Sequence, residues 1–552
     1  MNIVSRILRA KPIGSNPERH RRPRALVICA HLRLGRRKSR SNYLMQPITG
    51  LHIGSLLDSK HFEVRLYHED WHGPFDPAQA PGYELVFLTG LQPDFDRMRQ
   101  LAYAFRRAGS VVVAGGSICT LFPEFASQFF DVVCVGGVDC VREVADDYLR
   151  GKLKPIYRVP ADRISRYTVD YGLLAKSGIS PKVHLMEASR GCSFRCTFCI
   201  IPAEIGGHAG YDLGDLSTSI DRAVATSPIY SFRRWYPLIM FLDNNFSDDR
   251  AHMLRICDLL ASHRKIRGWS ALVTQNVLQD RELVRRLARS KCIGLFAGLE
   301  SFDQGMLRRY NKTQNLGRRQ NIVEDILFAE SLGIAVGYGY LFDPRYQNAA
   351  EMEAQIRMIA RTPALPMPTY LSVVAPLAGT ASFWADLAEG RLAPNLRLRD
   401  LDGETIGYSQ LADSPEALVS FVERMFRRPW TVVGRLGIVL KTLRRLVRAG
   451  SLDPVRWYVT TAANLHWFIW SSTSLSQPRT YLAGTEVLDP QYFEHPDTLS
   501  EADRKRYFEP IVLTDNDGYP VEWLKPYVPI TTKAKAEPKI VAQASGQGAI
   551  TI

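Results

Sequence analysis

The sequence lacks a long apolar run: no stretch of 18 or more residues is predominantly apolar, and the first residues lack the apolar core of a signal peptide. It is also poor in cysteine, with 9 among 552 residues. Six of them lie in apolar, strand-like or helical settings, where buried thiols are more usual than disulfides. We therefore expect a cytoplasmic protein in a reducing compartment. The six are Cys29, Cys119, Cys134, Cys140, Cys257 and Cys292.

The composition is that of a globular protein, with 46% hydrophobic and 23% charged residues, and the length predicts two or three domains. The net charge is +14, because 70 lysines and arginines outnumber 56 acidic residues. Much of the excess lies in residues 6–40 and 424–448. Such blocks suit nucleic acid, an anionic membrane surface or an anionic substrate, and they also occur on solvated faces.

The most informative stretch is Glu187–Cys199, which reads EASRGCSFRCTFC and follows an apolar run that ends at Met186. A short loop with C-x3-C-x2-C spacing can bring three thiolates to three corners of an iron–sulfur cube, which normally has four cysteine ligands. No fourth cysteine is near, so one iron would be open to another ligand. A structural zinc site completed by His208 is the alternative, although zinc ligands usually come as two spaced pairs. The three cysteines are Cys192, Cys196 and Cys199.

This spacing, with the aromatic Phe198 before the last cysteine, resembles the radical S-adenosylmethionine (SAM) superfamily. The resemblance implies a [4Fe-4S] cluster on Cys192, Cys196 and Cys199, with SAM bound to the fourth iron through its amino and carboxylate groups. Reductive cleavage of SAM would then give a 5′-deoxyadenosyl radical. In such enzymes the cofactor supplies the chemistry, and the protein positions and shields it.

Strand–helix alternation from Val183 to about Val374 resembles the partial (β/α)6 barrel of this superfamily. The expected strand 238–242 ends in Asp243 and Asn244, where the resemblance places acceptors for the SAM amino group.

Three further residues of this half are candidates by the same resemblance. A Gly-x-Glu-Ser sequence makes Glu300 a candidate for the ribose hydroxyls. Gly337, in an expected strand 334–341, allows close approach of the adenine or the substrate. Lys312 matches a recurring lysine of the family, and its alternative reading is a surface lysine at a helix end.

Residues 24–150 also alternate between strands and helices, which predicts a doubly wound parallel sheet. Ligands bind such sheets at the carboxyl ends of the strands, where two glycine pairs fall here: Gly115-Gly116 and Gly136-Gly137. Glycine lets the backbone approach a ligand closely. The expected strands are 25–30, 62–67, 85–89, 111–114 and 132–135, with helices at 95–108 and 141–149.

This half resembles the cobalamin-binding domain that precedes one branch of radical SAM proteins, so we expect cobalamin here. Base-off cobalamin proteins carry D-x-H-x-x-G after the first strand. Here that place reads CAHLRLG, without the aspartate and with the glycine one residue late. His31 is therefore disfavoured as a cobalt ligand, because a ligating histidine usually needs an acidic partner. The stretch YHEDWHG at 67–73 is interpreted as a polar loop rather than a metal site.

The resemblance extends over residues 24–395 and includes P-x-x-G-T at 376–380. Beyond it we expect a helix at 414–426 and a basic amphipathic helix at 432–448, which either packs on the barrel or lies in a membrane interface, followed by an aromatic segment at 456–470. The predicted organisation is a basic arm (1–23), a cobalamin-binding-like Rossmann domain (24–150), a linker (151–180), the partial barrel (181–395), a mostly helical region (396–528) and a disordered tail (529–552).

The leading hypothesis is a cobalamin-type radical SAM enzyme, which resembles hopanoid and natural-product methylases and the anaerobic Mg-protoporphyrin ester cyclase. It would abstract hydrogen from an unactivated carbon of a lipid, tetrapyrrole or natural product and then transfer a methyl group from methylcobalamin. Flavodoxin or ferredoxin would donate the electron, and the inner face of the membrane is a possible contact. The alternatives are a cobalamin-independent cyclase or oxidoreductase, and a non-enzymatic sensor. An RNA-modifying enzyme is disfavoured, because no second cysteine set or β-rich C-terminal barrel is evident.

Overall fold

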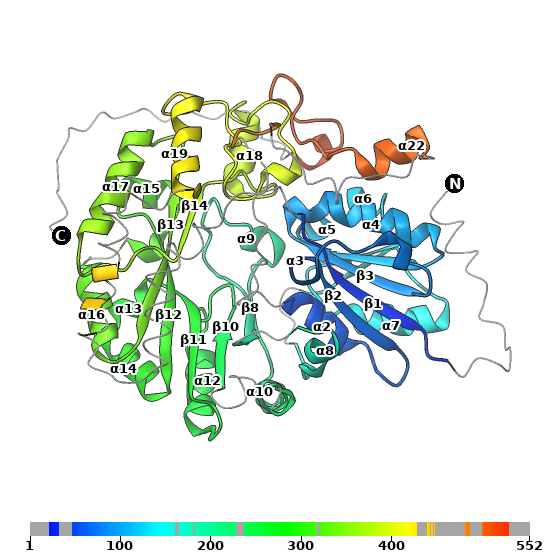
Figure 1. Cartoon of the computed structure of the whole chain (residues 1–552), viewed down its shortest axis with the longest axis horizontal. Helices are drawn as coiled ribbons and strands as arrows, with labels where there is room; N and C mark the ends of the chain where they lie inside the picture. The colour runs from blue at the N-terminus through cyan, green and yellow to red at the C-terminus, as the bar shows by residue number, and fades with distance from the viewer. Residues whose placement is uncertain are drawn as a thin grey trace.

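The computed structural model describes residues 21–32, 47–160, 165–179, 183–227, 237–316, 321–427, 439–441, 443–444, 447, 481–485 and 499–528. Residues 1–20, most of the expected basic helix at 432–448, the aromatic segment at 456–470 and the tail at 529–552 lie outside the described residues. Figure 1 shows two sheets side by side, each with its own helices.

The first sheet is parallel throughout, with the strand order β2-β1-β3-β4-β5-β6. This is the doubly wound pattern, whose topological switch lies between β1 and β3. The sixth strand and the helix α8 (Gly172–Lys176) fall in the residues expected to form a linker. The strands are β1 (Arg24–Cys29), β2 (Glu63–His68), β3 (Leu85–Gly90), β4 (Val111–Gly116), β5 (Val132–Val135) and β6 (Ile156–Arg158).

Helices flank this sheet, and two of them were expected from the sequence: α4 (Phe95–Arg107) and α7 (Val141–Arg150). One helix, α2 (Ile48–Leu56), was not expected; seven of its nine residues are buried, so it shows no alternation of polar and apolar positions. The remaining ones are short: α3 (Glu69–His72), α5 (Ser117–Leu121) and α6 (Pro123–Ala126).

The second sheet is also parallel, in the order β14-β13-β12-β11-β10-β7. Neighbouring strands follow each other along the chain, as in a barrel built from repeated strand–helix units, and the sheet stays open. The predicted partial barrel is confirmed. The strands are β7 (His184–Met186), β10 (Leu238–Phe241), β11 (Gly268–Thr274), β12 (Cys292–Glu300), β13 (Ala335–Phe342) and β14 (Tyr370–Val373).

The helices around the second sheet begin at side-chain caps. Asp212, Asp249, Asp280 and Asn348 each accept a backbone N–H of the first turn, which satisfies donors that have no partner within the helix. These caps fix where each strand-to-helix loop ends. The helices are α10 (Leu213–Thr226), α12 (Arg250–Ser262), α13 (Asn276–Gln279), α14 (Arg281–Arg289), α15 (Gln304–Arg309), α16 (Ile322–Ser331), α17 (Ala349–Arg361), α18 (Ala381–Ala388) and α19 (Pro415–Arg427).

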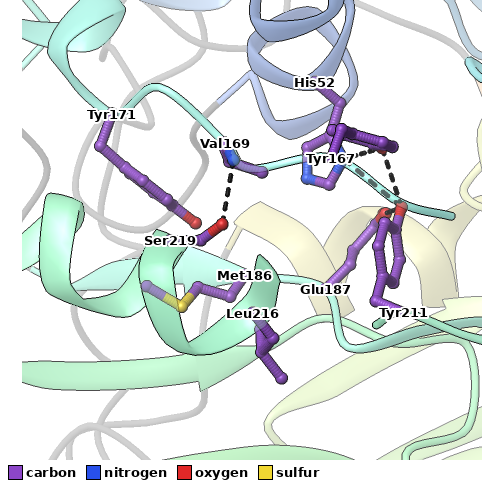
Figure 2. Close-up of a pocket in the computed structure, with 9 residues that line it drawn as sticks. All are labelled: His52, Tyr167, Val169, Tyr171, Met186, Glu187, Tyr211, Leu216 and Ser219. Atoms are coloured by element: carbon purple, nitrogen blue, oxygen red, sulfur yellow. Dashed lines mark hydrogen bonds between the residues drawn. The ribbon is translucent and has the colours of Figure 1, made fainter. Parts of the chain in front are cut away.

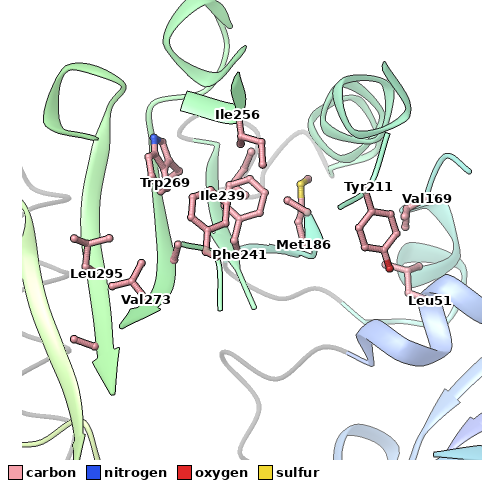
Figure 3. Packing of buried hydrophobic residues seen from close by; sticks show 14 of the residues in the cluster. Leu51, Val169, Met186, Tyr211, Ile239, Phe241, Ile256, Trp269, Val273 and Leu295 are labelled. Carbon is pink, nitrogen blue, oxygen red and sulfur yellow. The ribbon is translucent and has the colours of Figure 1, made fainter. Parts of the chain in front are cut away.

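The core runs through both sheets. In β1 the residues alternate between two buried clusters, because both faces of a parallel sheet are covered. One cluster extends from Leu51 of α2 through Tyr211 and Met186 to Phe241 and Trp269 of the second sheet (Figure 3). The two halves therefore share one continuous apolar interior.

The second cluster joins the first sheet to the C-terminal residues 499–528, which lie beside the helices α4 and α6 in Figure 1. The indole of Trp523 stacks on Phe125 with ring centroids 3.9 Å apart. The described part of this region holds only short helical turns, such as α22 (Glu501–Asp503). Among the helices described in the structure, none is long and apolar enough to cross a membrane.

Candidate active site

A single cavity of about 1190 Å³ lies where the carboxyl ends of the two sheets meet. The first sheet contributes the ends of β1, β3, β4 and β5, and the second contributes Asn244, Glu300 and residues of β13 and β14. Pockets for one small ligand usually measure about 300–1,000 Å³. The cavity therefore has room for more than one ligand.

The four glycines predicted to approach a ligand line this cavity. A Cβ at Gly116 would lie 2.5 Å from the carbonyl oxygen of Gly90, and the φ of Gly116 is +108°, so no other residue fits there without strain. Gly136 and Gly137 also have positive φ, at 84° and 143°. The first sheet thus presents bare backbone to the cavity.

From this edge the cavity continues into a part that is lined mainly by apolar side chains, here called the apolar slot. Its wall includes Ile53 of α2, Phe87 of β3, Val113 of β4 and Val141 of α7. The slot therefore reaches between the sheet and its helices, where an extended, mostly apolar part of a ligand could lie.

His31 lies in the cavity wall, and its ring nitrogens are 3.7 Å from Asp70 and 3.7 Å from Asp94. The local motif had no aspartate, but the fold brings acidic partners from two other elements. The neighbouring stretch at 67–73, which was expected to be a polar loop, instead forms the end of β2 and the helix α3. In it Glu69 is buried and binds Arg97, whereas His68 and Asp70 line the cavity.

The cysteine loop begins at a small antiparallel pair, β8 (Ser189–Gly191) with β9 (His208–Gly210). Gly191 has a φ of +85°, and a Cβ there would lie 1.8 Å from the carbonyl oxygen of Gly207, so this turn requires glycine. After the loop, α9 (Ile201–Glu204) places Ile200, Ile201 and Ile205 in the cavity wall.

The three thiols of the loop are half-buried, and two of them receive side-chain amide donors. Asn245 Nδ2 lies 3.6 Å from Cys192 Sγ, and Gln314 Nε2 lies 3.5 Å from Cys196 Sγ. Burial raises the pKa of Cys192, and it raises the pKa of Cys199 to about 12, so both free thiols are protonated at neutral pH. Metal binding would have to release these protons.

The fit to an iron–sulfur cluster rests on these donors, since hydrogen bonds to cysteine sulfur tune such clusters. In the described part of the chain, no three His, Cys, Asp or Glu side chains are grouped closely enough to hold one metal ion. His208, the histidine considered for zinc, pairs with Gly191 across the β8–β9 ladder, and its buried Nε2 has no hydrogen-bond partner. The roles of the cysteines stay a prediction.

Asp243 and Asn244 take different positions. Asp243 is 1% exposed and accepts hydrogen bonds from Ala188 N at 2.9 Å and Ser189 Oγ at 2.5 Å. Burial raises its pKa to about 7. Asn244 accepts from Gly191 N at 2.9 Å and lines the cavity. Asp243 therefore holds the start of the loop in place, and Asn244 is the one of the two that lines the cavity.

Glu300 lies in the cavity wall and pairs with Lys312, with Nζ 2.7 Å from Oε1. A register shift in β12 between Gly298 and Glu300, and a φ of +65° at Glu300, place this carboxylate at the strand end. Lys312 is 6% exposed, so the reading of a surface lysine is wrong. Burial alone would lower the pKa of Lys312, but the nearby charge of Glu300 has the larger effect, so the pKa is above its usual value.

The remaining candidates differ in their access to the cavity. Phe198 lines it and meets Tyr310 edge-on at 5.1 Å. Gly339 also lines it, whereas Gly337 faces Thr369, whose Oγ1 would lie 2.5 Å from a Cβ at that glycine. Gly337 therefore serves packing between β13 and the segment before β14, rather than the cavity wall.

Two residues of the cavity wall were not singled out from the sequence. Glu187 and Arg190 flank the start of the cysteine loop, and Arg190 donates to Glu187 through Nε at 2.9 Å. Burial raises the pKa of Glu187, but the charge of Arg190 outweighs it and holds that pKa below its usual value. The pair is therefore ionised within the protein interior.

No family model matches the chain. The chain is similar to the bacteriochlorophyllide d C-8(2)-methyltransferase of Chlorobaculum tepidum, with 26% identity over 347 residues, which cover 60% of this chain and 74% of that protein. The hopanoid C-2 methylase of Rhodopseudomonas palustris is 23% identical over 273 residues, covering 47% of this chain and 49% of that protein.

A solved structure shares the fold. The cobalamin-dependent SAM radical enzyme OxsB, with aqua-cobalamin and SAM bound, aligns with a TM-score of 0.52 at 14% identity, covering 83% of this chain and 77% of that one. In sequence the chain is therefore similar to methyltransferases and a methylase, and in fold it is similar to a cobalamin-dependent SAM radical enzyme.

Proposed function

We propose that this chain is a radical SAM methyltransferase that methylates an unactivated carbon of a small, largely apolar molecule. The observation that carries the proposal is the one cavity that joins the glycine-lined edge of the first sheet to the cysteine loop of the second. A methyl carrier on one side and a radical source on the other would meet in the same cavity. The names of the relatives, which are methyltransferases and a methylase, point the same way.

The [4Fe-4S] cluster would be held by Cys192, Cys196 and Cys199, with the amides of Asn245 and Gln314 donating to sulfur. When bound, the cluster would supply the electron for the reductive cleavage of SAM, and cobalamin would supply the methyl group. Flavodoxin or ferredoxin is the proposed electron donor.

Cobalamin would lie over the glycine pairs, with its nucleotide portion in the apolar slot beside Ile53 and Val141. Because glycine has no side chain, a large ring could lie close to the backbone at this edge.

SAM would lie between Asn244 and Glu300, the two polar side chains at neighbouring strand ends of the second sheet. Asn244 offers an amide to the methionine end, and the carboxylate of Glu300 accepts hydrogen bonds from the ribose diol. Lys312 fixes that carboxylate, since their ion pair is buried. Phe198, Ile200 and Ile201 exclude water from the space between them.

The substrate would enter beside β14, where Tyr370 is 55% exposed and lines the cavity. The wall there is mainly apolar, with Val373, Val374 and Leu377. Apolar walls favour a lipid, a tetrapyrrole or an apolar natural product over nucleic acid. We also propose that the protein works in the cytoplasm and meets apolar substrates at the membrane surface.

The test is the cofactor content of the chain purified without oxygen from cells supplied with cobalamin. We expect about four irons and one cobalt per chain, SAM cleavage to deoxyadenosine, and transfer of a labelled methyl group to product. Iron without cobalt would exclude methyl transfer from cobalamin, and zinc in place of iron would exclude the radical chemistry.

A further inference from the structure

A buried chain of hydrogen bonds connects His52 of α2 to Glu187, which precedes the cysteine loop (Figure 2). His52 of α2 is 1% exposed, and its Nδ1 lies 2.6 Å from the hydroxyl of Tyr167. The hydroxyls of Tyr167 and Tyr211 are 3.2 Å apart, and Tyr211 donates to Glu187 Oε2 at 3.1 Å. A cavity of about 10 Å³ beside them has room for roughly one water.

The hydrogens in this chain have one order that fills every contact. Burial lowers the pKa of His52 to about 4, so its imidazole is neutral. Each tyrosine has a single hydrogen, and Tyr211 uses its own on Glu187. Tyr167 therefore donates to Tyr211, and His52 donates through Nδ1 to Tyr167. All donors point toward the carboxylate, which holds Glu187 in place for Arg190.

Arg190 reaches across the boundary between the two halves of the molecule. Its Nε and Nη2 bind Glu187, each at 2.9 Å. A Cβ built at Gly137 would lie 3.5 Å from Nη1, so this nitrogen lies over the second glycine pair. Within the described residues, Nη1 has no hydrogen-bond partner of its own.

The charge of Arg190 is also exceptional in this cavity. Among the described residues that line it, Arg190 is the one lysine or arginine. Several carboxyl groups line the same wall, and no second lysine or arginine among the described lining residues accompanies them. They belong to Asp70, Asp94, Glu187, Glu204, Glu300, Asp402 and Glu404.

We propose that Arg190 donates from Nη1 to an oxygen atom of bound cobalamin at the Gly136-Gly137 edge, and that the chain from His52 to Glu187 holds it there. The acceptor is either a side-chain amide of the corrin ring or the nucleotide phosphate, since both present oxygen to a guanidinium. The inference rests on the proposed function, because it requires cobalamin in this cavity. The proposed contact runs from Arg190, at the start of the cysteine loop, to the cofactor on the first sheet. Binding of cobalamin would therefore order the start of the cysteine loop.

The experiment is a titration of the full-length chain with hydroxocobalamin, followed by absorbance, for wild type, Arg190→Gln and Arg190→Lys. Loss of a charge-assisted hydrogen bond is expected to raise Kd about 10- to 100-fold in Arg190→Gln. Arg190→Lys should recover part of the affinity. Arg195→Gln is the matched control, because Arg195 is in the same loop, carries the same charge and is exposed. Its Kd should equal that of wild type.

A second ligand identifies the oxygen. Cobinamide keeps the corrin amides and lacks the nucleotide phosphate. An equal loss of affinity for cobinamide and cobalamin in Arg190→Gln would assign an amide oxygen, and a loss for cobalamin alone would assign the phosphate.

Folding is followed by circular dichroism and iron content. Should Arg190→Gln fail to fold, Tyr167→Phe carries the test: it removes one donor from the chain, keeps the ring, and should raise the cobalamin Kd about 3- to 10-fold. An unchanged Kd in every folded variant would overturn the inference and leave the proposed function standing. A wild-type chain without saturable cobalamin binding would overturn both.

Discussion

The two parallel sheets end at the same cavity but present different groups to it. The first sheet presents glycines, so the ligand there meets backbone and an apolar slot. The second presents the cysteine loop, Asn244 and Glu300, each held by a buried partner. The same six-stranded parallel arrangement thus serves two purposes.

The difference lies in what each surface must do. A large cofactor that carries its own reactive atom needs room and shape, which glycine provides by the absence of a side chain. A radical source needs fixed polar groups, which cost free energy to bury unless they are paired. Variants of one sheet should therefore affect cofactor content differently from variants of the other.

The largest effect is expected from Cys192→Ala, Cys196→Ala and Cys199→Ala combined. Loss of the three proposed cluster ligands should remove all of the roughly four irons per chain and abolish SAM cleavage, while cobalamin binding by the first sheet is kept. Iron, sulfide and cobalt are counted after anaerobic purification. Cys257→Ala is the control, because Cys257 is buried in α12 away from the loop. A triple variant that keeps its iron would contradict the site.

The second largest effect is expected from Glu300→Gln. It leaves the Lys312 ammonium buried without its counter-charge, and breaking a buried pair costs about 3–5 kcal/mol. The free energy of unfolding in urea measures this loss, and SAM affinity should fall with cobalamin affinity unchanged. Asp258→Asn breaks an exposed pair with Arg286 and should cost less than about 1 kcal/mol. Equal losses in the two variants would refute a buried role.

Asp243 should make stability depend on pH. Its pKa is about 7 in the folded chain, because of burial, and about 3.9 in an unfolded chain. The folded state holds a proton that the unfolded state lacks between these values. Stability from this group is thus complete below about pH 4 and falls by up to about 4 kcal/mol as pH rises to 7.

Asp243→Asn should flatten that decline, which is measured as the unfolding free energy at pH 5 and pH 7.5. Asp249→Asn is the control with the opposite sign. The backbone N–H of His252 holds the pKa of Asp249 below its usual value, so its contribution is lost only at more acidic pH. Parallel pH curves for wild type and Asp243→Asn would rule out the assignment.

The smallest effect is expected from a variant of the first sheet. Gly116→Ala forces a Cβ to within 2.5 Å of Gly90 O at a φ of +108°, which should cost about 1–3 kcal/mol and weaken cobalamin binding while iron stays. Gly151→Ala shares the positive φ, at +66°, with no atom within 4 Å of the new Cβ. It should cost less and leave cobalamin affinity unchanged. Thermal unfolding and cobalamin titration separate the two.

Much of the fold could be predicted from the sequence, because local patterns determine it. The five strands expected in the first half all occur, each shifted by no more than a few residues. The two glycine pairs lie at the predicted strand ends. The carboxyl edge of a parallel sheet gathers such residues whatever the connecting helices are.

The rest depended on contacts between distant residues. His31 lies close to Asp70 and Asp94, which come from other elements and which the local motif does not predict. The burial of Lys312 requires Glu300, which lies in another element. Arg190 was read only as part of the cysteine motif, since no local signal tells that it reaches Gly137.

The C-terminal segment has a consequence for how the chain becomes folded. Arg106 of α4 donates to the hydroxyl of Tyr507, 401 residues later, and Arg99 donates to the carbonyl of Arg506. The aromatic side chains of Phe122 and Phe125 are covered by Trp523. The half of the molecule that leaves the ribosome first is thus completed by residues synthesised long after it. Until they arrive, that aromatic face stays open, and a nascent chain in this state is a natural client for a chaperone.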